Sequence, residues 1–343
     1  MKPTSERAQS PIVYGTDGRT EYFDVDDPST ERLFERSIVV LAPRVLVGPE
    51  VDLENAPRLG EQQNLCTGER FTDQPAVAFC TGVLVSAELV LTAGHCLRAY
   101  ALQDTVALFD YFYEVPGRLA TTSQSQRDII EIVAEELDPV GTTPRLDVAW
   151  VRIEPASRNR EPIDLSQRAA LPFEGQPLHV IGSVSGTPLK DDHSGTVRGP
   201  LRPQRDYFSA DTDTSHGASG SGAFDVSGRL IGILARGGND WVSDGGCSRA
   251  AEGSQRSAQE EYTYTFRALE LLCAGDNYSG SLCDSSSKAR GGDALEVGST
   301  GCSLDAGCSY ASRPRNMGLV LCLALGAIAT RRRATLDAAA GRS

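Results

Sequence analysis

From about residue 75 to residue 272 the sequence consists of short apolar runs separated by turn residues. Examples are residues 83–85, 89–91, 106–109, 148–151 and 179–181. Runs this short, bounded by Gly, Pro, Ser and Asp, are typical of strands in all-β proteins. Residues 223–233 read as a hairpin turning at Ser227-Gly228. With 34 Gly but only two Met and two Trp, the composition also favours a turn-rich β fold over a helical bundle.

The segments on either side differ in composition from this β-rich region. Residues 1–35 are mostly polar and read as an N-terminal segment and candidate pro-region, although the sequence leaves open whether residues 1–11 are removed. Residues 36–272 form the predicted main domain, with a first strand at 37–42 and a closing amphipathic helix over 255–272. Residues 273–316 are rich in Ser, Gly and Asp, which predicts a flexible linker.

The last segment, residues 317–343, contains an apolar run at 317–330 followed by three arginines at 331–333. Fourteen helical residues span roughly 21 Å, which is short of the ~30 Å hydrocarbon core of a bilayer. The positive-inside rule places the arginines in the cytoplasm and the main domain outside. We therefore expect a sorting or anchoring tail, in preference to an unstructured end.

Charge and cysteine content limit the function and the compartment. The net charge of −13 argues against nucleic acid as a partner, because phosphate binding needs clustered Lys and Arg. The nine cysteines contain no paired CxxC motifs, so disulfides in an oxidising compartment are favoured over a zinc ribbon. Residues 1–10 lack the apolar run of an export signal, so we expect either an upstream start or another export route.

The strongest chemical signal is a histidine that follows two apolar runs. Residues 79–85 and 90–96 are joined at 86–88, and the second run ends in Thr-Ala-Gly-His-Cys with His95. Cys80 and Cys96 flank this hairpin and are suitably placed to fasten its ends together. A base that transfers protons must be held in position. The arrangement therefore favours a catalytic role for His95 over a structural one.

A candidate nucleophile lies in the glycine-rich segment 215–222. Gly217 allows the backbone to turn so that its amide and that of Ser219 point to one place, as an oxyanion site requires. Ser221 is the competing nucleophile, but it would put Ser219 where the oxyanion glycine belongs. A plain surface loop is disfavoured because the hairpin at 223–233 follows at once. Ser219 is therefore the predicted nucleophile.

The third candidate is Asp147, at the head of the apolar run 148–151. A buried carboxylate is costly unless a hydrogen-bonding partner compensates it. His95 would be that partner, and an aspartate in this role orients the imidazole and stabilises its cation.

The order His95, Asp147, Ser219, with the Thr-Ala-Gly-His-Cys and Gly-x-Ser-Gly motifs, resembles the chymotrypsin family of serine proteases over residues 36–272. The continuation of Ser219 into Gly-Ser and the segment 13–19 are closer to the bacterial glutamyl-endopeptidase-like (V8-like) branch. The resemblance implies two six-stranded antiparallel β-barrels, with His95 and Asp147 on the first barrel and Ser219 on the second. It implies serine endopeptidase activity on protein or peptide substrates, by a monomer, without metal or organic cofactor.

The sequence departs from parts of this family pattern. Ala218 replaces the aspartate that animal trypsins use on activation, so that switch is absent. Leu234 occupies the place of the histidine that glutamyl endopeptidases use for acidic P1 residues. Counting back from Gly217 puts Asp213 at the floor of the S1 pocket, where it would favour Arg or Lys at P1, unless it caps a turn. The predicted substrate-binding residues are Asp213, Thr214, Leu234 and Arg236.

The sequence leaves open the cysteine pairing, the modification site in the tail and whether catalysis is retained. A bridge between Cys66 and Cys247 is one pairing, with Cys273 as a rival partner for either. The tail resembles sorting tails of myxobacteria-like surface proteins, which makes Cys302 and Cys308 candidate modification sites and favours a secreted or surface-attached bacterial protein. The alternative function is a surface binding module that kept the fold and lost catalysis. An α/β-hydrolase is rejected, because it needs its serine before its aspartate and histidine.

Overall fold

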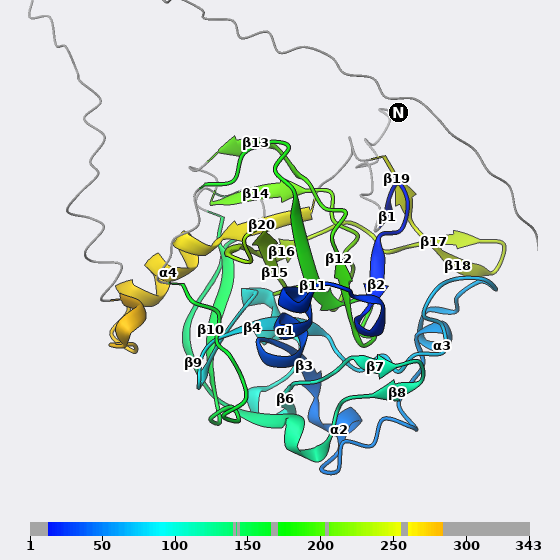
Figure 1. The fold of residues 1–343 in the computed structure, drawn as a ribbon, viewed down its shortest axis with the longest axis horizontal. Helices are drawn as coiled ribbons and strands as arrows, with labels where there is room; N and C mark the ends of the chain where they lie inside the picture. The colour runs from blue at the N-terminus through cyan, green and yellow to red at the C-terminus, as the bar shows by residue number, and fades with distance from the viewer. Residues whose placement is uncertain are drawn as a thin grey trace, which may run out of the picture. The chain divides into compact units, whose positions relative to one another are not determined.

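The computed structural model describes residues 13–139, 142, 145–165, 171–202, 206–254 and 260–283. Its first half is a closed six-stranded barrel in the order β10-β5-β4-β3-β6-β9 (Figure 1). The strands are β3 Ile38–Pro43, β4 Cys80–Ser86, β5 Leu89–Thr92, β6 Thr105–Leu108, β9 Gln126–Leu137 and β10 Asp147–Ile153. All six residues of β3 are buried, which explains its unbroken apolar sequence. Closure leaves this barrel without an exposed edge.

The second half is an eight-stranded sheet in the order β13-β14-β20-β16-β15-β11-β12-β2. The strands are β2 Arg19–Glu21, β11 Leu178–Ser183, β12 Leu189–Asp192, β13 Val197–Arg202, β14 Tyr207–Ala210, β15 Gly222–Asp225, β16 Leu230–Arg236 and β20 Glu260–Tyr264. The predicted hairpin around Ser227-Gly228 is formed by β15 and β16.

This second sheet curls back on itself through the residues between β12 and β13. The Leu178 amide donates to the Gly195 carbonyl at 3.0 Å, and the Val197 amide donates to the Gln176 carbonyl at 2.8 Å. The chain from β12 to β13 therefore stays paired with the start of β11, and β12 and β13 act as one bent strand. The predicted fold class, an all-β fold of two six-stranded barrels, is confirmed, with β2 added at the edge of β12.

The C-terminal helix begins later than predicted. The sequence suggested a helix over 255–272, but Glu260–Tyr264 is strand β20 and the helix α4 spans Thr265–Ala274. Strand β20 pairs with both β14 and β16, so a helix there would leave two strand edges without hydrogen bonds. Residues 255–259 lie outside the described ranges.

The chain stays packed beyond residue 272, where a flexible linker was expected. Cys273 forms a disulfide with Cys283, and the Asn277 side chain donates to the Val133 carbonyl at 3.3 Å. The folded body therefore includes residues 273–283. The rest of the predicted linker and the tail at 317–343, with Cys302 and Cys308, lie outside the described residues.

Much of the N-terminal segment also belongs to the folded body. Residues 13–36 form β1 Val13–Tyr14, β2, the turn η1 Tyr22–Asp24 and the helix α1 Pro28–Arg36. Asp27 caps α1 by accepting from the Thr30 amide at 2.9 Å, and Phe34 of α1 is fully buried. The expected separate segment 1–35 is thus wrong for residues 13–35. Residues 1–11, whose removal the sequence leaves open, lie outside the described residues.

The remaining elements are short and lie on the surface of the two barrels. They are α2 Arg44–Val47, α3 Leu59–Gln63, η2 Gly94–Arg98, η3 Leu102–Asp104, β7 Tyr113–Val115, β8 Arg118–Leu119, η4 Ser123–Ser125, β17 Trp241–Asp244, β18 Cys247–Ala250 and β19 Glu252–Gly253. A disulfide joins Cys66 to Cys247, so of the two pairings considered for Cys66 the structure has this one. Within the described ranges no helix is long and apolar enough to cross a membrane.

Trp150 joins the first barrel to α4, and its replacement should measure that contact. The fully buried indole donates to the Ala268 carbonyl at 2.9 Å. We expect Trp150→Phe to lower the free energy of unfolding by about 1–3 kcal/mol, because a buried hydrogen bond is lost. Val226→Ala is the control, since Val226 is 80% exposed and its change should stay within about 0.5 kcal/mol. Equal urea midpoints for the two variants would contradict this account.

Candidate active site

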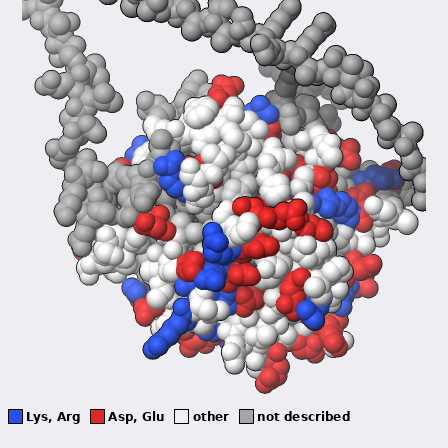
Figure 2. Space-filling model, in the orientation of Figure 1, with Lys and Arg blue, Asp and Glu red and all other residues white. Residues whose placement is uncertain are grey.

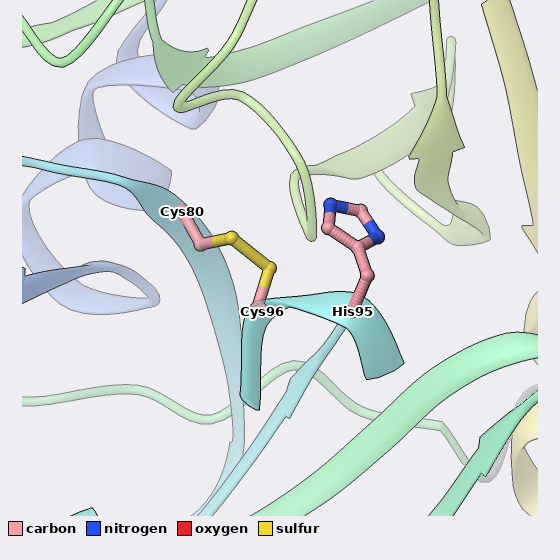
Figure 3. A group of neighbouring side chains, drawn as sticks. All are labelled: Cys80, His95 and Cys96. Carbon is pink, nitrogen blue, oxygen red and sulfur yellow. A yellow bond between two sulfur atoms is a disulfide. The ribbon is translucent and has the colours of Figure 1, made fainter. Parts of the chain in front are cut away.

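His95 lies in η2, directly after the β4–β5 hairpin. The Cys80–Cys96 disulfide fastens η2 to the start of β4, and Figure 3 shows the imidazole beside this disulfide. Gly94 allows the backbone to pass close to β9, since a Cβ at this position would lie 2.6 Å from the Glu136 carbonyl oxygen. The position of the histidine is therefore fixed by a strand hairpin, a covalent bridge and a residue that must be small.

Asp147 is the first residue of β10, and only 2% of its surface is exposed. One carboxylate oxygen, Oδ2, lies 3.0 Å from His95 Nδ1, and Oδ1 accepts the His95 backbone amide at 3.0 Å. The carboxylate therefore favours the imidazole tautomer with the proton on Nδ1, which leaves Nε2 as a base. Arg236 Nη2 lies 3.7 Å from the same carboxylate and gives it a positively charged partner.

Ser219 lies in a loop fixed by two glycines with left-handed backbone conformations. Gly217 has φ +90° and Gly220 has φ +87°. A Cβ on Gly220 would lie 2.0 Å from the Thr81 carbonyl oxygen and 2.2 Å from Thr92 Oγ1, so no other residue fits. Thr81 of β4 also donates from its amide to the Ser219 carbonyl at 2.7 Å. The loop of the second barrel is thus held against the first.

Exposure distinguishes the two candidate serines. Ser221 is fully buried, and its Oγ has no hydrogen-bond partner among the described residues. Ser219 is half-buried and lines the same cavity of about 430 Å³ as His95 and Asp147. The structure therefore brings His95, Asp147 and Ser219 together and separates Ser221 from them.

The amides of this loop alternate in their use. Ala218 donates to the Ser215 carbonyl at 2.9 Å, and Gly220 donates to the Leu234 carbonyl at 2.7 Å. The amides of Gly217 and Ser219 donate to no acceptor within the described part of the chain. These two amides, which the sequence analysis assigned to an oxyanion site, are therefore free to donate to a ligand in the cavity.

Of the four predicted substrate-binding residues, the structure places three at the cavity and one away from it. Thr214, Leu234 and Arg236 line the cavity, but Asp213 does not. Asp213 is buried, and its carboxylate accepts the amides of Tyr14 at 2.7 Å and Gly18 at 2.8 Å. It therefore fastens the N-terminal segment instead of forming the pocket floor. Burial, with the neighbouring Asp192, raises the pKa of Asp213 to about 6.

Two acidic groups in the cavity were missed by the sequence analysis. Asp240 Oδ2 lies 2.5 Å from His216 Nδ1, and this carboxylate raises the pKa of the exposed imidazole. Glu260 of β20 is buried, and burial raises its pKa to about 8. Glu260 fell inside the predicted helix, and only recognition of the strand would have pointed to its position.

One group of metal-ligating residue types lies at the site, namely Cys80, His95 and Cys96. The two sulfur atoms are bonded to each other, so neither is a thiolate. Zinc and similar ions need deprotonated cysteine ligands. These residues do not fit a metal centre.

Two barrels with a histidine, a buried aspartate and an accessible serine in the cleft between them are the arrangement of the chymotrypsin fold. Residues 80–233 match the family model described as "Trypsin-like peptidase domain". No curated protein sequence matches the chain significantly.

Among solved structures, human heparin binding protein is 16% identical, with a TM-score of 0.43, and the match covers 77% of this chain and 98% of that one. A serine endoprotease from Yersinia pestis is 14% identical, with a TM-score of 0.41, covering 73% of this chain and 66% of that one.

The two glycines at 220 and 228 allow a matched test of the close approach behind Ser219. Both have positive φ, but a Cβ on Gly228 would meet nothing within 4 Å. We expect Gly228→Ala to cost about 1–2 kcal/mol of stability from backbone strain alone. Gly220→Ala should cost at least about 2 kcal/mol more, because backbone atoms must move. Thermal denaturation of both variants checks this, and equal losses would show that the close approach is unimportant.

The raised pKa of Glu260 predicts a pH dependence of stability. Its pKa is about 8 in the folded protein against an ordinary 4.5, so between these values the folded protein holds a proton that the unfolded chain has lost. The free energy of unfolding should therefore fall as the pH rises through this window. Glu260→Gln stays neutral and should flatten that slope. Urea unfolding at pH 5, 7 and 9, in a Ser219→Ala background that prevents self-cleavage, measures it; parallel slopes would contradict it.

Proposed function

We propose that this protein is a serine endopeptidase in which His95, Asp147 and Ser219 form the catalytic triad. One observation carries the proposal: the buried Asp147 carboxylate lies 3.0 Å from His95 Nδ1 in the cavity that Ser219 also lines. It is supported by the match of residues 80–233 to a trypsin-like peptidase domain. It is supported further by the unengaged amides of Gly217 and Ser219.

In the proposed mechanism Ser219 Oγ attacks the scissile carbonyl carbon while His95 Nε2 removes the hydroxyl proton. The amides of Gly217 and Ser219 donate to the oxyanion of the tetrahedral intermediate, and each such donor is worth about 100- to 1,000-fold in kcat. His95 then gives the proton to the leaving amine, which leaves an acyl group on Ser219. A water molecule, activated by His95, hydrolyses this ester and restores the serine. Asp147 keeps the imidazole oriented throughout.

Labelling by a fluorophosphonate probe tests this assignment. We expect the purified protein to be labelled, and Ser219→Ala to abolish labelling. Ser221→Ala is the matched control: because Ser221 is buried, this variant should label like the parent.

Labelling that persists in Ser219→Ala would contradict the nucleophile. Absence of labelling in a folded parent protein would favour the alternative, a trypsin-fold binding protein without catalysis. An intact disulfide content and a cooperative thermal transition show that the protein tested is folded.

We also propose that the protein works outside the cytoplasm as a monomer of the bacterial glutamyl-endopeptidase-like branch. The three disulfides support this, since such bonds persist in oxidising compartments. The apolar run at 317–330 with its arginines supports attachment to a membrane or cell surface. Fractionation of producing cells before and after deletion of residues 317–343 tests it; an unchanged distribution would count against attachment.

A further inference from the structure

We propose that Glu260 is the specificity-determining residue of the cleft and that it selects substrates with Lys or Arg at P1. The P1 assignment rests on the proposed peptidase function, but the binding of a cation at Glu260 can be tested without catalysis. It assigns to a strand residue the role that the sequence pattern gave to Asp213.

The first argument is position. Glu260 is the first residue of β20, which pairs with β16, and β16 runs directly into the cleft wall at Gly237 and Gly238. A Cβ on Gly237 would lie 2.3 Å from Glu260 Oε2, so the carboxyl group is in contact with the bare backbone of that wall. Because no side chain lies between them, Glu260 forms part of the inner surface of the cavity that Ser219 lines.

Glu260 also differs from the other carboxylates of the cleft in how its charge is compensated. The cleft is lined by four carboxylates, those of Asp138, Asp147, Asp240 and Glu260. Asp147 is paired with His95 and Arg236, and Asp240 is paired with His216. Asp138 is only partly buried, so water reaches it, and it accepts the Leu146 amide at 2.8 Å.

Glu260, in contrast, is buried and has only neutral partners in the described chain. Its Oε2 accepts the Thr214 hydroxyl at 2.7 Å and its Oε1 accepts the Tyr14 hydroxyl at 3.2 Å. The guanidinium of Arg236 forms its ion pairs with Asp147 and Glu261. A buried acid without a cation is unfavourable in its charged form, which the high pKa of Glu260 reflects.

These contacts define which ligand the site suits. A carboxylate has about four lone-pair positions, and the two hydroxyls and the Gly238 amide leave room for a further donor from the cleft. A Lys ammonium or Arg guanidinium would supply that donor, and its positive charge would stabilise the ionised form of Glu260. An acidic P1 side chain would face a second acidic group, and an apolar one would leave Glu260 protonated and without a partner from the substrate. A basic P1 residue is therefore favoured over the acidic one of glutamyl endopeptidases.

Binding of p-aminobenzamidine, a small fluorescent cation, tests the proposal in a Ser219→Ala background. We expect Glu260→Gln, which keeps the shape but cannot ionise when the cation binds, to weaken binding by about 10- to 100-fold, the usual value of a hydrogen bond to a charged group. Asp213→Asn is the matched control. It should change the affinity less than 3-fold, because Asp213 binds the amides of Tyr14 and Gly18 outside the cleft.

A second variant leaves the charge in place and blocks access to it. Gly237→Ala would put a methyl group against the Glu260 carboxyl and should weaken binding to a similar degree, so the proposal stays testable if Glu260→Gln does not fold. Affinity unchanged in both variants, no binding to the parent, or loss of binding only in Asp213→Asn would each overturn the proposal.

The active protein gives a second readout, in peptide substrates that differ only at P1. The ratio of kcat/KM for Lys over Leu should exceed 10 and should fall at least 10-fold in Glu260→Gln. If the fluorophosphonate does not label the parent protein but p-aminobenzamidine still binds in a Glu260-dependent way, the proposed catalysis is rejected and the role of Glu260 stands. Intact labelling with an unchanged P1 ratio would reject the role of Glu260 alone.

Discussion

The two barrels meet at Thr81, and the geometry of the candidate site depends on this residue. Its amide donates to the Ser219 carbonyl at 2.7 Å, and its hydroxyl donates to the Gly217 carbonyl at 2.8 Å. The same hydroxyl accepts the Ser183 amide at 3.1 Å, and the Thr81 carbonyl accepts Thr92 Oγ1 at 2.7 Å. Thr81 is fully buried, so water does not compete for these bonds. One strand residue of the first barrel thereby sets where the second barrel presents its serine.

Buried carboxyl groups perform a similar task for the N-terminal segment. Asp192 accepts the Asp213 amide at 2.6 Å, and Asp213 in turn holds the backbone of Tyr14. The hydroxyl of Tyr14 then reaches Glu260 at the cleft. The molecule is acidic overall, and Figure 2 shows acidic side chains grouped on one face, but these internal carboxyl groups are enclosed by amides and hydroxyls. Segment 13–18 is thus part of the structure behind the cleft. Asp213 holds it, whereas animal trypsins hold their N-terminus with an aspartate at the position of Ala218.

Sequence reasoning worked where a short local pattern fixes the backbone. The Thr-Ala-Gly-His-Cys run predicted a histidine held at the end of a hairpin, and the structure places His95 there beside Asp147. Ser219 was chosen over Ser221 because Ser221 would put a serine where the oxyanion glycine belongs, and in the structure Ser221 is buried while Ser219 lines the cavity.

The failures arose where the outcome depends on distant strands. Asp213 was placed by counting along a loop, but which carboxyl reaches the cleft depends on the pairing of β20 with β16, far along the chain. Glu260 was read as helical because Tyr262, Tyr264 and the apolar residues after them are compatible with either period. The sequence analysis did not predict helix α1. This helix is capped by Asp27 and packs through Phe34, and one buried aromatic residue in a mostly polar segment is too weak a pattern to indicate a helix.

The Cys66–Cys247 disulfide closes a loop of 181 residues, and His95, Asp147 and Ser219 all lie within it. Exposed surface turns are the first places at which a protease cuts a folded protein. One cut anywhere between the two cysteines leaves both pieces covalently joined. The halves of the candidate site then remain at high effective concentration, held also by the contacts of Thr81. The bridge thus gives the protein a tolerance to nicking that neither barrel has alone.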